Sequence, residues 1–260
     1  MNEPIYLQRE GALGALVLNR PGKKNALTLS MWQAIPRLLD SAESDAALRV
    51  LILRGGDGQS FASGSDIGEL GQVYASAATA RDYDRALERA QRRLAEVALP
   101  TVALIQGPCM GGGCGLALAC DLRFADETAR FAIPPARLGL VFSVAGTRRL
   151  VEAVGASAAR DLLYSARTVS AEEALRIRLV DRLFPAGDLL CETRAYAERV
   201  AALSPGSVRA AKRMVRLILD GAADDSPEAM ALFSAAHESG DFHEGRAAFL
   251  ERRPPRFSGD

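Results

Sequence analysis

The feature that most constrains this chain is a glycine-rich segment, Gly107–Gly115, which directly follows a short apolar run, Thr101–Ile105. The apolar run has the length and the flanking Gly and Pro residues of a buried strand. Three consecutive glycines then open an apolar, helix-compatible stretch, Leu116–Cys120. A helix start carries unpaired N–H groups and a partial positive charge, and glycine leaves those donors open to a ligand. The segment predicts a strand-to-helix turn that binds a phosphate or a developing oxyanion, with close helix–strand packing as the alternative.

The spacing of these glycines argues against two common ligand loops. A P-loop needs the pattern GxxxxGK[ST], and no lysine follows the glycines here. A dinucleotide fingerprint needs GxGxxG, and glycines at positions 111, 112, 113 and 115 do not supply it. Binding of an oxyanion therefore remains a possible function of the segment Gly107–Gly115.

A second segment, Phe61–Asp66, follows another predicted strand, Leu48–Leu53. Open α/β folds place ligands at the carboxyl ends of parallel strands, so both segments are candidates for one site. The adjoining residues, Gly58–Ala62, faintly resemble a nucleophile elbow around Ser60. Its fifth position is alanine rather than glycine, so we do not expect a serine nucleophile.

Composition excludes several classes of function. The 260 residues carry 32 basic and 32 acidic side chains, so no nucleic-acid or membrane partner is indicated. No leader or membrane-spanning run is visible, and we expect a cytoplasmic protein. Four cysteines match no zinc pattern, and we expect them to be reduced and buried. The two histidines, His237 and His243, do not share a helical face, so we expect no metal site and no separate cofactor.

Hydrophobic periodicity predicts a mixed α/β core over residues 1–190 and a helical region over residues 191–260. Gly14–Leu18 is a further predicted strand, and Asp121–Phe124 and Leu179–Phe184 are weaker ones. The predicted helices are Leu27–Asp40, Arg81–Val97, a segment capped by Ser170 and Glu173, Cys191–Leu203, Val208–Leu219 and Pro227–Ser239 with Ser226 as its N-cap.

Taken together, these segments resemble the enoyl-CoA hydratase/isomerase (crotonase) superfamily over about three quarters of the chain. The order and spacing of the matching segments carry the resemblance. They are Leu18–Pro21, Asn25–Leu27, Phe61–Asp66, Gly107–Gly115, Ala119–Asp121, Phe131–Pro134, Leu138–Leu140, Gly146–Leu150, Glu173–Leu175 and Leu179–Asp181.

The resemblance implies a spiral of ββα units whose C-terminal helices form a homotrimer or a dimer of trimers. It implies an acyl-CoA substrate and an oxyanion hole made by the backbone N–H groups of Ser63 and Gly112. Gly64, Ser65 and Asp66 would line the acyl-CoA passage. Lys23 and Lys24 follow the Arg20-Pro21 turn, and they would either meet the CoA phosphates or be solvated turn lysines. Asp66 also fits a second role, which is to cap nearby N–H groups and orient its loop.

The chain departs from the family at the two positions where hydratases carry catalytic glutamates. These positions hold Gly115 and Pro135, and neither residue transfers protons. Ser143 stands where some members have a catalytic aspartate, although an N-cap role fits it as well. The leading expectation is an acyl-CoA enzyme that stabilises a thioester enolate, for example in decarboxylation. The alternatives are hydration or isomerisation through another carboxylate, with Glu69 and Asp66 the first to test, and a non-catalytic acyl-CoA-binding protein.

Overall fold

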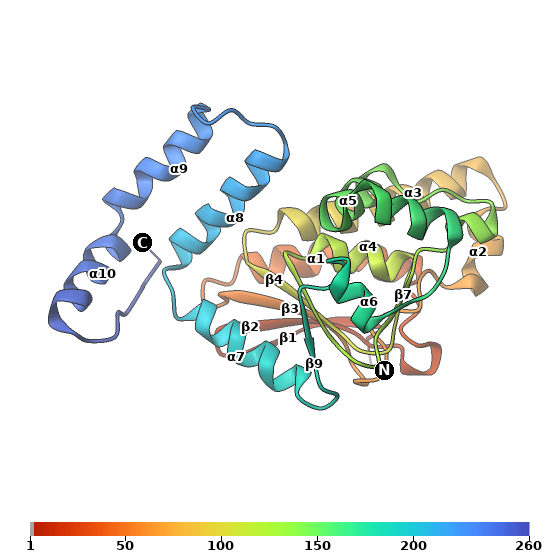
Figure 1. The fold of residues 1–260 in the computed structure, drawn as a ribbon, viewed down its shortest axis with the longest axis horizontal. Helices are drawn as coiled ribbons and strands as arrows, with labels where there is room; N and C mark the ends of the chain where they lie inside the picture. The colour runs from red at the N-terminus through yellow and green to blue at the C-terminus, as the bar shows by residue number, and fades with distance from the viewer. Residues whose placement is uncertain (1–2, 260) are drawn as a thin grey trace.

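A computed structural model describes residues 3–259 as an α/β core from which a helical arm extends (Figure 1). The core is built on a six-stranded sheet with the order β1-β2-β3-β4-β6-β9. β1 and β2 are antiparallel, and the other neighbours are parallel. The strands are β1 (Ile5–Glu10), β2 (Leu13–Leu18), β3 (Val50–Gly55), β4 (Thr101–Ile105), β6 (Leu122–Asp126) and β9 (Arg182–Phe184).

A second, three-stranded sheet lies beyond the carboxyl ends of the first. It consists of β5 (Pro108–Met110), β7 (Arg130–Ala132) and β8 (Val169–Ser170). The chain passes from β4 to β5 and from β6 to β7 before each following helix, so successive ββα units wind into a spiral. This arrangement confirms the fold class predicted from the sequence.

Four helices stack over one face of the main sheet. They are α1 (Leu29–Glu43), α3 (Ala77–Glu96), α4 (Gly112–Ala119) and α5 (Val144–Ser165), and each contacts the next in the order α1, α3, α4, α5. The apolar core between these helices and the sheet includes Trp32, Leu53, Phe61 and Leu116, all buried. Helix α4 lies between α3 and α5 in this stack, and its residues are apolar on every side.

The opposite face of the sheet is covered by α7 (Leu189–Ala201), which packs against β2, β3, β4, β6 and β9. Its buried Leu189 and Ala197 join Phe124 of β6 in a second apolar cluster. The boundary predicted between residues 190 and 191 therefore lies within α7, which packs on the core. The helices that extend away from the core begin with α8, whose range is Pro205–Leu219.

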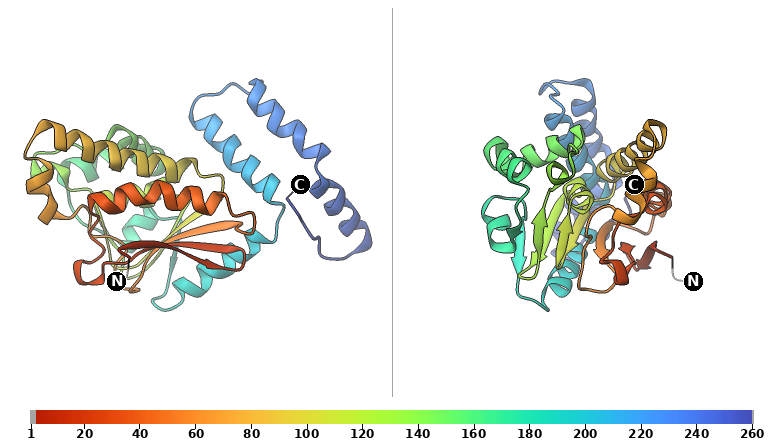
Figure 2. Two further views of the ribbon diagram at one scale, coloured as in Figure 1. Left: turned by 180° about the vertical axis from the view of Figure 1, so that it is seen from behind. Right: turned by 90° about the vertical axis from the view of Figure 1, so that its right-hand side faces the viewer.

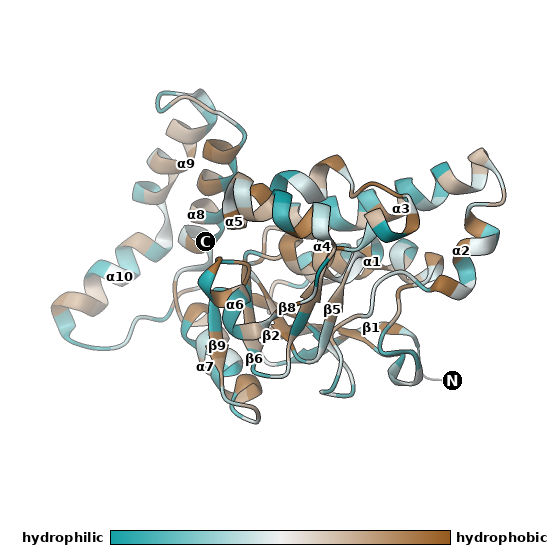
Figure 3. Ribbon diagram, turned by 45° about the vertical axis from the view of Figure 1, so that its right-hand side comes forward, coloured by the Kyte–Doolittle hydropathy of each residue, from teal (hydrophilic) through white to brown (hydrophobic). Residues whose placement is uncertain are grey.

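The arm consists of α8 (Pro205–Leu219), α9 (Pro227–Glu238) and α10 (Gly240–Glu251), and it projects from one end of the core in Figures 1 and 2. Figure 3 shows hydrophobic residues along these helices. The large apolar side chains exposed on the arm are Val215, Ile218, Leu219, Met230, Phe233, Phe242, Phe249 and Leu250. No helix among residues 3–259 is both long and apolar enough to cross a membrane.

Serine caps account for several helix starts that the sequence predicted. Ser226 accepts a hydrogen bond from the Ala229 N–H at the start of α9. Ser170 caps α6 (Ala171–Arg176), but the Glu173 side chain pairs with Arg167, so the expected capping box forms only on the serine side. The prediction that all four cysteines are buried was wrong for Cys191, which is exposed.

Candidate active site

Hydrogen bonds hold the two predicted site segments side by side. The Ala62 N–H donates to the Pro108 carbonyl at 2.9 Å, and the Met110 N–H donates back to the Ala62 carbonyl at 2.9 Å. Gly64 has a φ of 100°, and a Cβ added there would lie 3.2 Å from the Met110 carbonyl oxygen. Glycine is therefore required at position 64 both by its backbone angle and by the closeness of the neighbouring chain.

This pairing brings Ser65 next to Gly112, the first residue of α4. A Cβ added to Gly112 would lie 3.5 Å from the Ser65 Oγ. Among residues 3–259, neither the Ser65 N–H nor the Gly112 N–H has a hydrogen-bond acceptor. Two unpaired backbone donors thus lie close together at a helix N-terminus, which is the arrangement that an oxyanion needs.

Ser63, which the sequence analysis expected as the first oxyanion donor, is already engaged. Its N–H donates to the Lys24 carbonyl at 2.9 Å, and its Oγ donates to the Lys23 carbonyl at 3.2 Å. The residues on either side of Ser65 both pair with Leu27, since the Gly64 carbonyl accepts from the Leu27 N–H at 2.8 Å and the Asp66 N–H donates to the Leu27 carbonyl at 2.9 Å. Because backbone groups alternate in direction along an extended segment, the Ser65 N–H points away from Leu27 and stays free. We therefore replace Ser63 with Ser65 in the candidate hole and retain Gly112.

A buried aromatic pair supports these two donors. The Trp32 Nε1–H of α1 donates to the Tyr83 hydroxyl of α3 at 3.1 Å. Burial raises the pKa of Tyr83, so its hydroxyl stays protonated. The Trp32 ring would lie 3.0 Å from a Cβ at Gly112, and so it fills the space behind the hole.

The donors open into a cavity of about 400 Å³. Of the residues predicted from the sequence, Ser63, Gly64, Ser65, Gly112 and Ser143 line it. The remaining lining residues are Ile67, Leu70, Tyr74, Tyr83, Asp84, Leu87, Glu88, Gln91, Met110, Gly111, Pro134, Pro135, Leu138, Leu140, Val141 and Phe142. Most of the wall is apolar, as expected for a site that holds an acyl chain.

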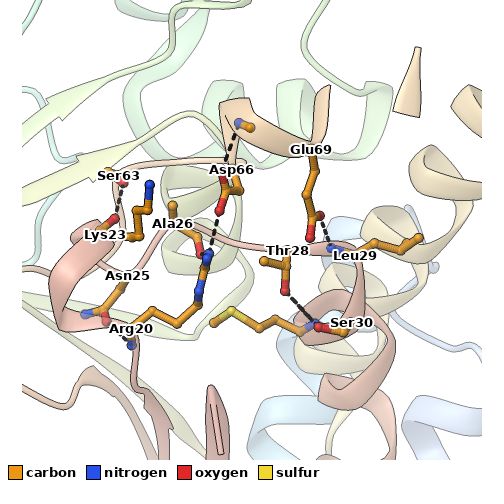
Figure 4. A network of polar contacts seen from close by, with 12 residues as sticks. Arg20, Lys23, Asn25, Ala26, Thr28, Leu29, Ser30, Ser63, Asp66 and Glu69 are labelled. Atoms are coloured by element: carbon orange, nitrogen blue, oxygen red, sulfur yellow. Dashed lines mark hydrogen bonds and ion pairs between the residues drawn. The ribbon is translucent and has the colours of Figure 1, made fainter. Parts of the chain in front are cut away.

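Asp66 and Glu69 hold the loop around the cavity in place (Figure 4). Asp66 caps α2 (Ile67–Val73) by accepting from the Gly68 N–H at 2.9 Å, and it pairs with Arg20 at 2.8 Å. The hydrogen bond from Arg20 holds the pKa of Asp66 below its usual range. Glu69 accepts from the Leu29 N–H at 2.8 Å. Both carboxylates are thus bound to the protein's own groups, which agrees with the loop-orienting role expected for Asp66.

The carbonyl of Lys24 accepts the hydrogen bond from the Ser63 N–H. Its φ of 47° is left-handed, and its side chain is exposed beside the Ser63–Asp66 loop. CoA binding by Lys24 and Asp66 stays a prediction. Ser143 caps α5 by accepting from the Gly146 N–H at 3.0 Å, which confirms the expected N-cap. Its own O–H is still available to donate at the cavity wall.

Three polar side chains on one face of α3 line the cavity and were not predicted from the sequence. Asp84, Glu88 and Gln91 lie on α3 at the spacing i, i+4, i+7, so they share one helix face. Asp84 lines the cavity, and partial burial raises its pKa. The sequence signal that we overlooked is Gln91 itself, which interrupts the apolar stripe of Leu87 and Leu94 at a buried helical position.

Gln91 also explains why position 115 is glycine. A Cβ added to Gly115 would lie 2.2 Å from the Gln91 Nε2, closer than any real contact. We predict that Gly115→Ala lowers the free energy of unfolding by about 1 kcal/mol because it overpacks this site. In a Gln91→Ala background the same change should be neutral or stabilising by up to about 1 kcal/mol, since alanine is the better helix former. Urea unfolding of the four proteins measures the difference, and equal effects in both backgrounds would contradict the steric explanation.

Comparisons with known proteins point to one family. The enoyl-CoA hydratase/isomerase family model matches residues 8–260. The chain is 33% identical to a 2,3-dehydroadipyl-CoA hydratase of Escherichia coli over 260 residues, covering 100% of both chains. It is 33% identical to a crotonyl-CoA hydratase of Syntrophomonas wolfei over 259 residues, covering 98% of each.

A solved structure extends the likeness to the backbone. The crystal structure of an enoyl-CoA hydratase/isomerase family protein from Hyphomonas neptunium superposes with a TM-score of 0.96 at 41% identity, covering 98% of this chain and 97% of that one. A match over nearly the whole length in sequence and in fold identifies the chain as a member of the enoyl-CoA hydratase/isomerase family.

Proposed function

We propose that the chain binds an acyl-CoA thioester with the carbonyl oxygen between the N–H groups of Ser65 and Gly112 and stabilises the enolate of that thioester. The observation that carries the proposal is the pair of unpaired backbone donors at the wall of an apolar cavity. Removing a proton beside a thioester, or adding a nucleophile to its conjugated double bond, builds negative charge on the carbonyl oxygen. Fixed donors stabilise that charge without having to reorganise during the reaction.

The proton-transfer group that we propose is a carboxylate of α3. Gly115 and Pro135 offer none, and Asp66 and Glu69 are held by other groups. Asp84 and Glu88 are the carboxylates that line the cavity. A carboxyl group whose pKa is raised by burial, as that of Asp84 is, is closer to the neutral range in which an acid–base catalyst works best. The hydratase names of the relatives favour hydration or double-bond chemistry over decarboxylation.

Proton exchange tests this function without assuming the natural substrate. In deuterated water, nuclear magnetic resonance should show the protein exchanging the protons beside the carbonyl of butyryl-CoA. Crotonyl-CoA should lose its conjugated ultraviolet absorbance if water is added as well. If a thioester binds but neither proton exchange nor loss of absorbance is seen, the protein binds acyl-CoA without catalysis. If no thioester binds, the proposal is refuted.

We also propose that the chain assembles as a trimer or a dimer of trimers through its helical arm. The arm exposes large apolar side chains such as Ile218, Phe233 and Phe249. Exposed apolar side chains that are grouped in this way are typical of a protein–protein interface. Light scattering after size exclusion should give a multiple of three chains. Phe233→Glu should shift the population toward smaller species, whereas a monomeric wild-type protein at micromolar concentration would reject the assembly.

A further inference from the structure

Arg149, on the second turn of α5, is a partly buried arginine whose guanidinium has no partner. Its Nη1 is enclosed and has no hydrogen-bond partner among residues 3–259. Its Nε and Nη2 are not enclosed in this way, so the outer edge of the guanidinium stays open. The adjacent Arg148 differs, because it is 63% exposed and lies 3.7 Å from Asp220 at the end of α8. Asp220 is also engaged by Arg216 at 2.8 Å, so it is not left for Arg149.

The charges around Arg149 do not neutralise it. Arg92 of α3 and Arg216 of α8 lie nearby and repel it. Glu96 and Glu152 attract it, but neither forms an ion pair with it. Burial and the neighbouring Arg216 hold the pKa of Arg149 below its usual value. A partly desolvated charge is costly unless an anion pairs with it, so we expect the anion to come from outside the chain.

The place of Arg149 in the fold indicates that this anion belongs to a second copy of the chain. Its neighbour Arg216 lies on α8, the first helix of the arm. Val215 and Leu219 of α8 are 57% and 52% exposed, and Leu219 shares a helix face with Arg216. The apolar surface that we propose for assembly therefore continues to the unpaired guanidinium. An apolar centre with a charged rim is the usual composition of a protein–protein interface, whereas a free anion needs no apolar surface beside it.

We propose that Arg149 is part of the interface between copies of this chain and that its Nε and Nη2 bind a carboxylate of the second copy. An arginine binds a carboxylate through two parallel hydrogen bonds, which fix orientation as well as adding affinity. The interface therefore includes the core surface where α3, α5 and the end of α8 meet, in addition to the apolar side chains of the arm. This inference rests on the proposed assembly, and it adds the core residue that fixes how one copy docks on the next.

Zero-length cross-linking tests the contact on the full-length protein. Arg149→Lys keeps a positive charge and supplies an amine, which a carbodiimide joins to a carboxylate in direct contact. Isotope-labelled and unlabelled chains of this variant are mixed, allowed to exchange and then treated. Mass spectrometry should find peptides that join position 149 of a labelled chain to a carboxylate of an unlabelled one.

Arg148→Lys is the matched control for the cross-linking experiment. Because Arg148 lies beside Asp220 of its own chain, this variant should form a cross-link within one chain. The proposal is overturned if position 149 is joined only to Glu96 or Glu152 of the same chain. It is also overturned if position 149 forms no cross-link while the control reacts.

The strength of assembly gives a second measurement, made by mass photometry from nanomolar to micromolar protein. Arg149→Gln should raise the concentration at which the assembly dissociates by at least about tenfold, because the carboxylate of the second copy is left unpaired. Arg148→Gln should change it by less than about twofold, since an exposed ion pair contributes little. Unchanged assembly of a folded Arg149→Gln protein would show that Arg149 has no role in the interface. A wild-type protein that is monomeric throughout would instead overturn the proposed assembly.

Discussion

Gly112→Pro should lower the rate of proton exchange beside the thioester by about 100- to 1,000-fold, because proline has no N–H and the change deletes one oxyanion donor. Position 112 is the first residue of α4, where a helix tolerates proline best. The measurement is the exchange rate at saturating butyryl-CoA, together with the Kd from calorimetry.

The control for this variant is Gly112→Ala, which adds a Cβ but keeps the N–H. That Cβ would lie 3.0 Å from the Trp32 ring, so a small shift of the ring is expected in both variants. If the alanine variant loses as much activity as the proline variant, crowding by Trp32 rather than the missing donor is responsible. Full activity in a folded Gly112→Pro protein would show that the Gly112 N–H is not a donor of the oxyanion hole.

Replacing both cavity carboxylates, with Asp84→Asn and Glu88→Gln together, should lower the exchange rate by about 100- to 10,000-fold, the usual contribution of a positioned acid or base. Both changes keep the shape of the side chain, and neither group contributes to the buried core, so binding of butyryl-CoA should change little. The single variants then show which of the two transfers the proton.

Asp82→Asn is the matched control for the carboxylates. Asp82 lies on the same helix and is well exposed, but it does not line the cavity, and its ion pair with the exposed Arg85 contributes little. Loss of activity in the control would point to a general effect of charge on α3. An active Asp84→Asn/Glu88→Gln protein would show that the proton acceptor is neither of these residues.

The sequence was most informative where chemistry constrains the backbone. The glycine run could be interpreted because glycine alone readily adopts the combination of φ 48° and ψ −109° found at position 111, and because glycine leaves the donor of residue 112 open. Helix starts were predictable where a serine caps them, as at Ser143 and Ser226, because the capping side chain is local in sequence. Together with the order of the motifs, these signals were enough for the fold class.

The choice between neighbouring donors was not predictable in the same way. Ser63 and Ser65 differ only in which N–H is paired, and that pairing is set by the Lys23–Lys24 turn, some 40 residues earlier in the chain. The short strands β7 and β8 were missed because two or three residues carry too little periodicity. Asp84 and Glu88 resemble ordinary solvated helix residues until the packing of α3 on α4 turns their face toward the cavity.

A thioester carbonyl bound in the cavity should receive hydrogen bonds from the N–H groups of Ser65 and Gly112. Infrared difference spectroscopy of crotonyl-CoA with an isotope-labelled carbonyl carbon reports on that bond directly, because hydrogen bonds to the oxygen weaken the C=O bond. We predict that the carbonyl band moves to lower wavenumber when the ligand binds, that Gly112→Ala keeps the shift and that Gly112→Pro loses much of it. A band that stays at its solution position when the wild-type protein is saturated would contradict the claim.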